Sequence, residues 1–177
     1  MKVQDVMSLE VEICRPDEDL NRVAQLMWER DFGVVPVVDP AGLVVGMITD
    51  RDLCMAAYTQ GRPLASICVG EVMSRTIHSC APGSSLEAAL SVMKEGRVRR
   101  LPVIDTGGSL VGLLSMSDLA RGAVREGRRG ERAFSTEVIE TLAVICEPRG
   151  RRSEDVATPA PELAERMANR KVGALTY

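Results

Sequence analysis

The chain has 177 residues, enough for one ordinary domain or for two very small ones that share a core. Hydrophobic residues make up 45% of it but include only one Trp, two Tyr and two Phe, so the core must be aliphatic. The formal net charge is −3, no apolar run approaches the ~20 residues of a membrane span, and the N-terminus lacks the apolar region of a signal peptide, so we expect a cytoplasmic protein.

The chain repeats itself at a spacing of 66 residues. Pro36-Val37 aligns with Pro102-Val103, and Gly46 aligns with Gly112, without a gap between them. Because glycine allows backbone conformations that other residues rarely adopt and proline fixes φ, their matched positions indicate a repeated backbone path. We predict repeats at residues 1–66 and 67–126, followed by an extension at 127–177.

Each repeat is predicted to run strand, helix, strand, strand, helix. Apolar residues recur at i, i+3, i+4 and i+7 from Leu20 and again from Leu86, which is typical of a helix that packs on a core. The remaining elements of the first repeat are expected at 11–14, 34–38, 43–48 and 50–59. In the second repeat, strands are expected at 76–79 and 101–104, and a further strand is expected after the turn at 105–108. The last helix of this repeat is expected at 116–126.

A hydroxyl followed three residues later by an aspartate stands at the end of the last strand of each repeat. The first pair is Thr49 and Asp52, and the second is Ser115 and Asp118. This spacing is a helix start, in which the hydroxyl caps a free backbone N–H and the acid favours the positive helix end. The same groups at a helix N-terminus can also meet a polar ligand, and the two interpretations are compatible.

Together these motifs resemble a tandem pair of cystathionine-β-synthase-type (CBS) domains, often called a Bateman module. The resemblance covers about residues 1–126 and rests on the segments 5–8, 33–39 and 45–53 with their second-repeat partners. It implies an α/β fold of two pseudo-symmetric repeats packed through their sheets. It also implies clefts between the repeats that receive adenosine nucleotides, and assembly into homodimers.

The resemblance assigns a ribose-binding role to the two motifs. A carboxylate can accept both ribose hydroxyls, and a neighbouring hydroxyl adds a third bond, so Thr49, Asp52, Ser115 and Asp118 carry this role. An adenine ring needs an apolar wall. The matching positions are Ile13, Val34, Val35 and Pro36 in one repeat and Ile77, Leu101 and Pro102 in the other.

Phosphate groups need positive charge, and here the repeats differ. Arg99 and Arg100 precede the second adenine wall, at positions where nucleotide-binding relatives carry basic residues, whereas the first repeat has no base there. Arg51 is a further candidate, because a guanidinium is a permanently charged, forked donor. Pairing with carboxylates on a solvated surface is the alternative for these arginines. We therefore expect unequal sites.

No catalytic or metal centre is expected. The sequence has one histidine, His78, and its five cysteines form no C-x-x-C pair. It therefore lacks the residue pattern of a catalytic triad, a zinc site or a disulfide framework. No phosphate-binding P-loop and no nucleophile elbow occur.

The extension begins with a basic stretch at 127–132, which we interpret as a solvated linker, since no aromatic residues accompany it to suit nucleic acid. A short helix is predicted at 136–146. Residues 163–175 resemble 23–35, either as an incomplete third repeat, which would need a packing partner, or by chance.

The sequence thus favours a non-enzymatic sensor that binds an adenine nucleotide such as AMP or ATP and acts on its own dimer or on a separate effector protein. The alternative is a dimerisation or scaffolding module whose clefts stay empty.

Overall fold

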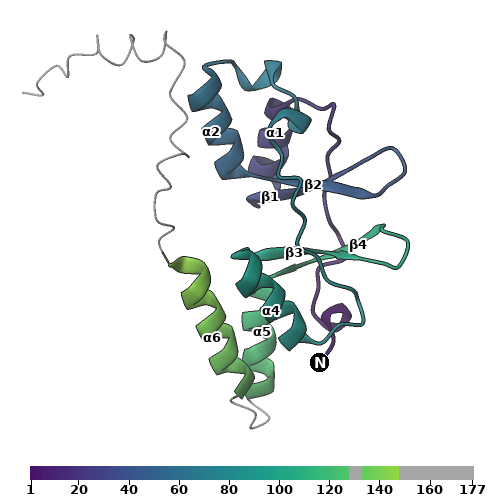
Figure 1. The fold of residues 1–177 in the computed structure, drawn as a ribbon, viewed down its shortest axis with the longest axis vertical. Coiled ribbons are helices and arrows are strands. Elements are labelled where there is room, and N and C mark those ends of the chain that lie inside the picture. The colour runs from purple at the N-terminus through teal and green to yellow at the C-terminus, as the bar shows by residue number, and fades with distance from the viewer. Residues whose placement is uncertain (128–132, 148–177) are drawn as a thin grey trace, which may run out of the picture.

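The computed structural model describes residues 1–127 and 133–147. Figure 1 shows two lobes stacked along the long axis, with the strands of both lobes facing each other in the middle and the helices turned outward. Each lobe holds one hydrophobic core, and the two cores are separate clusters of mainly aliphatic side chains. The predicted α/β class with two similar units is confirmed.

The first lobe is built from α1 (Leu20–Arg30), β1 (Val34–Val38), β2 (Val44–Thr49) and α2 (Asp50–Gln60). Asp19 caps α1 by accepting a hydrogen bond from the backbone N–H of Arg22 at 2.8 Å. The two strands pair in antiparallel register, and Gly42 adopts a φ of 84° in the turn between them. Short helices η2 (Leu64–Ser66) and α3 (Val69–Val72) then lead to the second lobe.

The second lobe repeats this path with α4 (Leu86–Gly96), β3 (Arg100–Ile104), β4 (Leu110–Ser115) and α5 (Met116–Gly127). Both helices begin 66 positions after their counterparts, as predicted. The strands again pair antiparallel, with an irregularity in the register at the same place as in the first lobe. The tips of the two hairpins meet through a bridge between Leu43 and Ser109.

The segment before each lobe packs on the other lobe. Ser8, next to the short helix η1 (Val3–Asp5), exchanges two backbone hydrogen bonds of 2.9 Å with Leu113 of β4. Ser74 forms the equivalent pair of bonds with Met47 of β2. Val3 is fully buried in the second core, whereas Ile67 and Val69 are buried in the first. The two repeats are therefore interlocked through their entry segments.

The expected opening strand of each repeat is shorter than predicted. Residues 11–14 and 76–79 form no regular strand, and the sheet is extended only by isolated parallel bridges from Cys14 to Val37 and from Cys80 to Val103. One bridge on each edge is enough to fix the position of the entry segment against β1 and β3.

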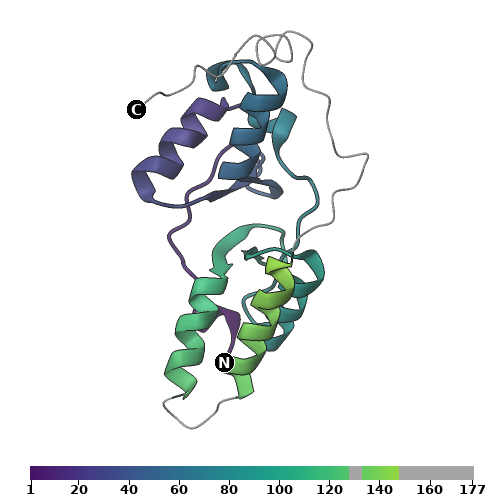
Figure 2. The same ribbon diagram turned by 90° about the vertical axis from the view of Figure 1, so that its left-hand side faces the viewer.

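The extension adds α6 (Ala133–Cys146), which begins three residues before its predicted start and packs against α4 and α5 (Figure 2). Phe134 and Val138 are buried there and join the second core. The segment 163–175, predicted to resemble a third repeat, lies outside the described residues. Among the residues described, no helix combines the length and apolar character needed to cross a bilayer.

Candidate functional site

The first hydroxyl-x-x-Asp motif forms a capping box at the start of α2. Thr49 ends β2, and its backbone N–H and its Oγ1 both donate to Asp52 Oδ2, at 2.8 and 2.6 Å. The backbone N–H of Asp52 donates back to Thr49 Oγ1 at 3.3 Å. Asp52 is half-buried, and its Oδ1 has no hydrogen-bond partner within the described part of the chain. One carboxylate oxygen is thus committed to the helix start and one is open.

The second motif repeats this geometry but engages both oxygens. The backbone N–H and the Oγ of Ser115 donate to Asp118 Oδ2, at 2.8 and 2.5 Å. Arg121, one helical turn further along α5, donates to Asp118 Oδ1. Asp118 is only 6% exposed, so its charge is compensated by hydrogen bonds and by one guanidinium. The capping interpretation is confirmed at both motifs, while the ribose role stays a prediction.

The residues predicted to form the adenine walls separate into three groups. Val35 and Leu101 belong to the two cores and are fully buried, so they support β1 and β3 from behind. Because side chains alternate along a strand, their neighbours Val34, Pro36 and Pro102 face the opposite side of each strand, where they are also buried. On the entry segments, Ile13 is 45% exposed and Ile77 is half-buried.

The predicted phosphate-binding arginines point to different neighbours. Arg99 donates to the Sγ of Cys146 at the end of α6, with 3.7 Å between Nη2 and Sγ. Arg100 instead lines a pocket of about 450 Å³ between the lobes. Arg51 is exposed on the first turn of α2. The sequence offered Arg99 and Arg100 of the second repeat and Arg51 of the first as separate candidates, and their role in phosphate binding stays a prediction.

The pocket between the lobes brings residues from both repeats together. Gly33 and Asp50 line it from the first lobe, and Arg100 lines it from the second; the remaining lining residues are Met27, Trp28, Asp31 and Phe32. Two carboxylates, of Asp31 and Asp50, and one guanidinium therefore line the same pocket. A Cβ at Gly33 would lie 2.7 Å from Asp50 Oδ2, so a larger residue there would displace the Asp50 side chain. Asp52 and Thr49 do not line this pocket.

Three polar residues around the motifs were not predicted. Arg121 could have been found, because an Asp and an Arg three residues apart share one face of a helix. Arg97 could not have been anticipated from its own surroundings in sequence, since its ion pair of 2.6 Å is with Glu147, fifty residues away. Asp50 lies inside the first motif, but a binding role was predicted for Asp52 and none for Asp50.

Comparison with known proteins places this arrangement in a family. A family model for the CBS domain matches residues 3–58 and 69–125. The chain belongs to the CBS domain family. The two lobes described above are therefore a CBS pair, as the repeated motifs predicted.

Individual CBS relatives cover most of the chain. The CBS domain-containing protein YhcV of Bacillus subtilis is 38% identical over 118 residues, which span 67% of this chain and 82% of YhcV. Hypoxic response protein 1 of Mycobacterium tuberculosis is 33% identical over 145 residues, which span 82% of this chain and 94% of that protein. The matched segments make up most of the length of both relatives.

Solved structures share the fold of this CBS pair. The structure of Hypoxic Response Protein I, which holds two coordinated zinc ions, matches with a TM-score of 0.62 at 32% identity over 69% of this chain and 98% of its own. The structure of CBSX2 from Arabidopsis thaliana in complex with AMP matches with a TM-score of 0.64 at 27% identity over 72% and 98%. Between residues 1 and 147, leaving out 128–132, no three His, Cys, Asp or Glu side chains are grouped to hold a metal ion.

Proposed function

We propose that this CBS pair is a non-enzymatic regulatory module that binds an adenosine-containing nucleotide of the AMP, ADP or ATP type at the boundary between its repeats. The supporting observation is the pair of carboxylates, Asp52 and Asp118, at equivalent helix starts in a fold that a relative uses to hold AMP. The binding energy would act on a separate effector protein or on a homodimer of this chain.

The two proposed sites differ in the state of their carboxylates. Asp52 keeps Oδ1 available for a ribose hydroxyl while Oδ2 holds the helix start. Asp118 has both oxygens engaged, so a ribose would have to displace the guanidinium of Arg121, whose side chain is 64% exposed. Because that displacement replaces a charge-assisted hydrogen bond, the first site should bind a nucleoside more tightly than the second.

Arg100 is the residue we assign to the phosphate. It lines the pocket between the lobes together with the backbone of the first repeat near Gly33, whereas Arg99 turns toward α6. A phosphate beside Arg100 would share the pocket with Asp31 and Asp50, so the attraction of the guanidinium must outweigh the repulsion of both carboxylates. AMP should therefore bind more tightly than adenosine, and this difference should depend on Arg100.

The proposal is tested by ligand-dependent thermal unfolding of the full chain with AMP, ATP, adenosine, NAD and S-adenosylmethionine. A ligand at 100 times its Kd stabilises the native state by about 2.7 kcal/mol, or roughly 5–10 °C for a chain of this size. Arg100→Ala should remove the preference for AMP over adenosine, and Arg22→Ala, at an exposed position on α1, is the matched control.

The scaffolding alternative makes the opposite prediction. If no adenine-containing ligand raises the midpoint at millimolar concentration while the chain assembles, the module serves dimerisation and its clefts stay empty. Equal stabilisation by adenosine and AMP in both the parent chain and Arg100→Ala would keep the nucleoside site and remove the phosphate assignment.

A further inference from the structure

The helical face of the second lobe is covered by α6. Phe134 and Val138 of this helix are 6% exposed and belong to the same buried cluster as Met93 of α4 and Leu119 of α5. Ile145, near the end of α6, also packs on this cluster. A third helix laid over the α4–α5 pair thus completes the second core.

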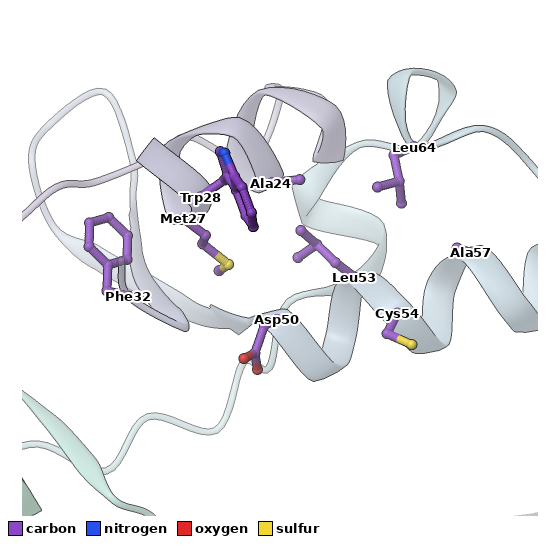
Figure 3. Close-up of a pocket in the computed structure, with 9 residues that line it drawn as sticks. All are labelled: Ala24, Met27, Trp28, Phe32, Asp50, Leu53, Cys54, Ala57 and Leu64. Carbon is purple, nitrogen blue, oxygen red and sulfur yellow. The ribbon is translucent and has the colours of Figure 1, made fainter. Parts of the chain in front are cut away.

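The equivalent face of the first lobe is open. Met27 and Leu53 stand 66 positions before Met93 and Leu119, at the same places on α1 and α2. Both are nearly buried and line the floor of an apolar pocket of about 340 Å³ between the two helices (Figure 3). Ala57 in this pocket is exposed, whereas its counterpart Ala123 in the second core is only 5% exposed. The other lining residues are Ala24, Trp28, Phe32, Asp50, Cys54, Ala57 and Leu64.

Trp28 marks this open face. Its side chain is 88% exposed, although a tryptophan in a folded core or interface normally buries most of its large apolar surface. In Figure 3, Met27, Trp28 and Phe32 reach the pocket from one side, and Leu53 reaches it from the start of α2. Leu64 of the connection η2 lies on the side of the pocket away from Phe32 (Figure 3), and Cys54 and Ala57 on α2 are exposed.

The end of α6 brings the chain close to this groove. Glu147 pairs with Arg97, and Cys146 contacts Arg99, whose neighbour Arg100 shares a pocket with Met27, Trp28 and Phe32. Thirty residues follow Glu147 in the sequence, and an extended chain covers about 3.3 Å per residue, so the length easily spans the groove.

The sequence beyond Glu147 holds one stretch that suits the groove. In residues 162–171, Leu163 and Met167 are four positions apart, as on one face of a helix. Three basic residues against two acidic ones leave this stretch a net charge of +1; they are Arg166, Arg170 and Lys171, and Glu162 and Glu165. The polar rim of the groove carries Asp50 in both adjoining pockets and Asp31 in one, so the charges are complementary.

We propose that residues 162–171 dock as a helix in the groove between α1 and α2 of the same chain, covering the first lobe as α6 covers the second. Leu163 and Met167 fill the pocket beside Trp28, and the basic residues face Asp31 and Asp50. The extension then covers both lobes of the CBS pair and lies next to the pocket that contains Arg100.

Trp28 reports directly on this docking, because it is the only tryptophan of the chain. In the full chain, its emission should be shifted to the blue and protected from acrylamide quenching. Leu163→Asp should shift the emission to the red and cause a several-fold loss of protection, toward the quenching of N-acetyltryptophanamide. Asn169→Asp adds the same charge on the opposite side of the expected helix and should leave the signal unchanged.

The dependence of the protection on protein concentration distinguishes docking within one chain from docking of a second copy. Protection that is independent of protein concentration and is lost in Leu163→Asp supports docking within one chain. Protection that disappears on dilution shows that a second copy covers the groove and overturns the proposal. A Trp28 that is fully quenched in the parent chain, or protected equally in Leu163→Asp, overturns it as well. Far-UV circular dichroism of each variant verifies that the lobes are folded.

Discussion

Replacing Asp118 tests whether the second carboxylate is part of the fold before any ligand is present. Asp118→Ala removes the acceptor of two hydrogen bonds from Ser115 and the partner of Arg121 at a position only 6% exposed. Hydrogen bonds to a charged group contribute about 1.5–3 kcal/mol, and an acid in the first turn of a helix adds about 0.3–1 kcal/mol. Removing the burial cost of the charge offsets part of this, so we expect a loss of about 2 kcal/mol.

Replacing Asp52 should cost less stability than replacing Asp118. Asp52 forms the same capping box but is half-buried and has no arginine partner among the described residues, so Asp52→Ala should cost about 1 kcal/mol. Asp118→Asn keeps an oxygen that can accept from Ser115 and should lie between the parent chain and Asp118→Ala. Asp17→Ala, at an exposed position, is the control and should change stability by less than about 0.5 kcal/mol.

Urea unfolding followed by circular dichroism, without nucleotide, measures these differences. The expected order of stability is parent chain, then Asp52→Ala, then Asp118→Ala. If Asp118→Ala is as stable as the parent chain, the capping box contributes nothing to the fold, and the geometry at Asp118 must be maintained for ligand binding alone.

Further predictions concern the interlocked segments and the thiols. Gly112→Ala places a Cβ 2.7 Å from Met7 Sδ and 3.0 Å from the Ser8 carbonyl oxygen, so we expect a loss of about 1–3 kcal/mol in urea unfolding, whereas Gly83→Ala meets nothing within 4 Å and should be nearly neutral. Burial raises the pKa of the Cys14 thiol from 9.0 to about 12, so Cys14 should resist a thiol reagent at pH 8 that labels the exposed Cys54. Between pH 9.0 and about 12 the Cys14 thiol ionises in the unfolded chain but not in the folded one. The contribution of Cys14 to the free energy of unfolding is therefore complete below pH 9.0 and falls as the pH rises toward 12. A Cys14→Ser variant should lose this part of the pH dependence.

The repeated elements could be predicted because their signals are local. Strand β1 was placed at its observed bounds, and α2 and α5 ended one residue beyond their predicted limits, since glycine, proline and capping residues define these turns. The paired aspartates were found for the same reason, because a capping box is written in four consecutive residues.

The interlocking could not be predicted, because it depends on contacts between distant segments. Nothing near Ser8 indicates that its backbone pairs with Leu113, more than one hundred residues away. The packing of α6 on α4 and α5 also depends on contacts between distant segments. Periodicity shows that Val138 lies on an apolar face, but the helix that this face meets is decided by the whole fold.

The placement of the arginines was the least predictable part of the candidate site. Arg99 and Arg100 are adjacent in sequence, and a shared role in phosphate binding was the simplest interpretation. Successive side chains near the start of a strand point to opposite sides, so one contacts α6 and the other lines the pocket between the lobes.

Isothermal titration calorimetry of AMP into the full chain and into Asp52→Asn tests nucleotide binding at the paired carboxylates most directly. We expect saturable binding to the parent chain and a clear loss of affinity in Asp52→Asn, because an amide nitrogen at either position removes an acceptor for the ribose hydroxyls or for Thr49. Absence of saturable binding to the folded parent chain, or equal affinity in Asp52→Asn, would contradict the proposed function.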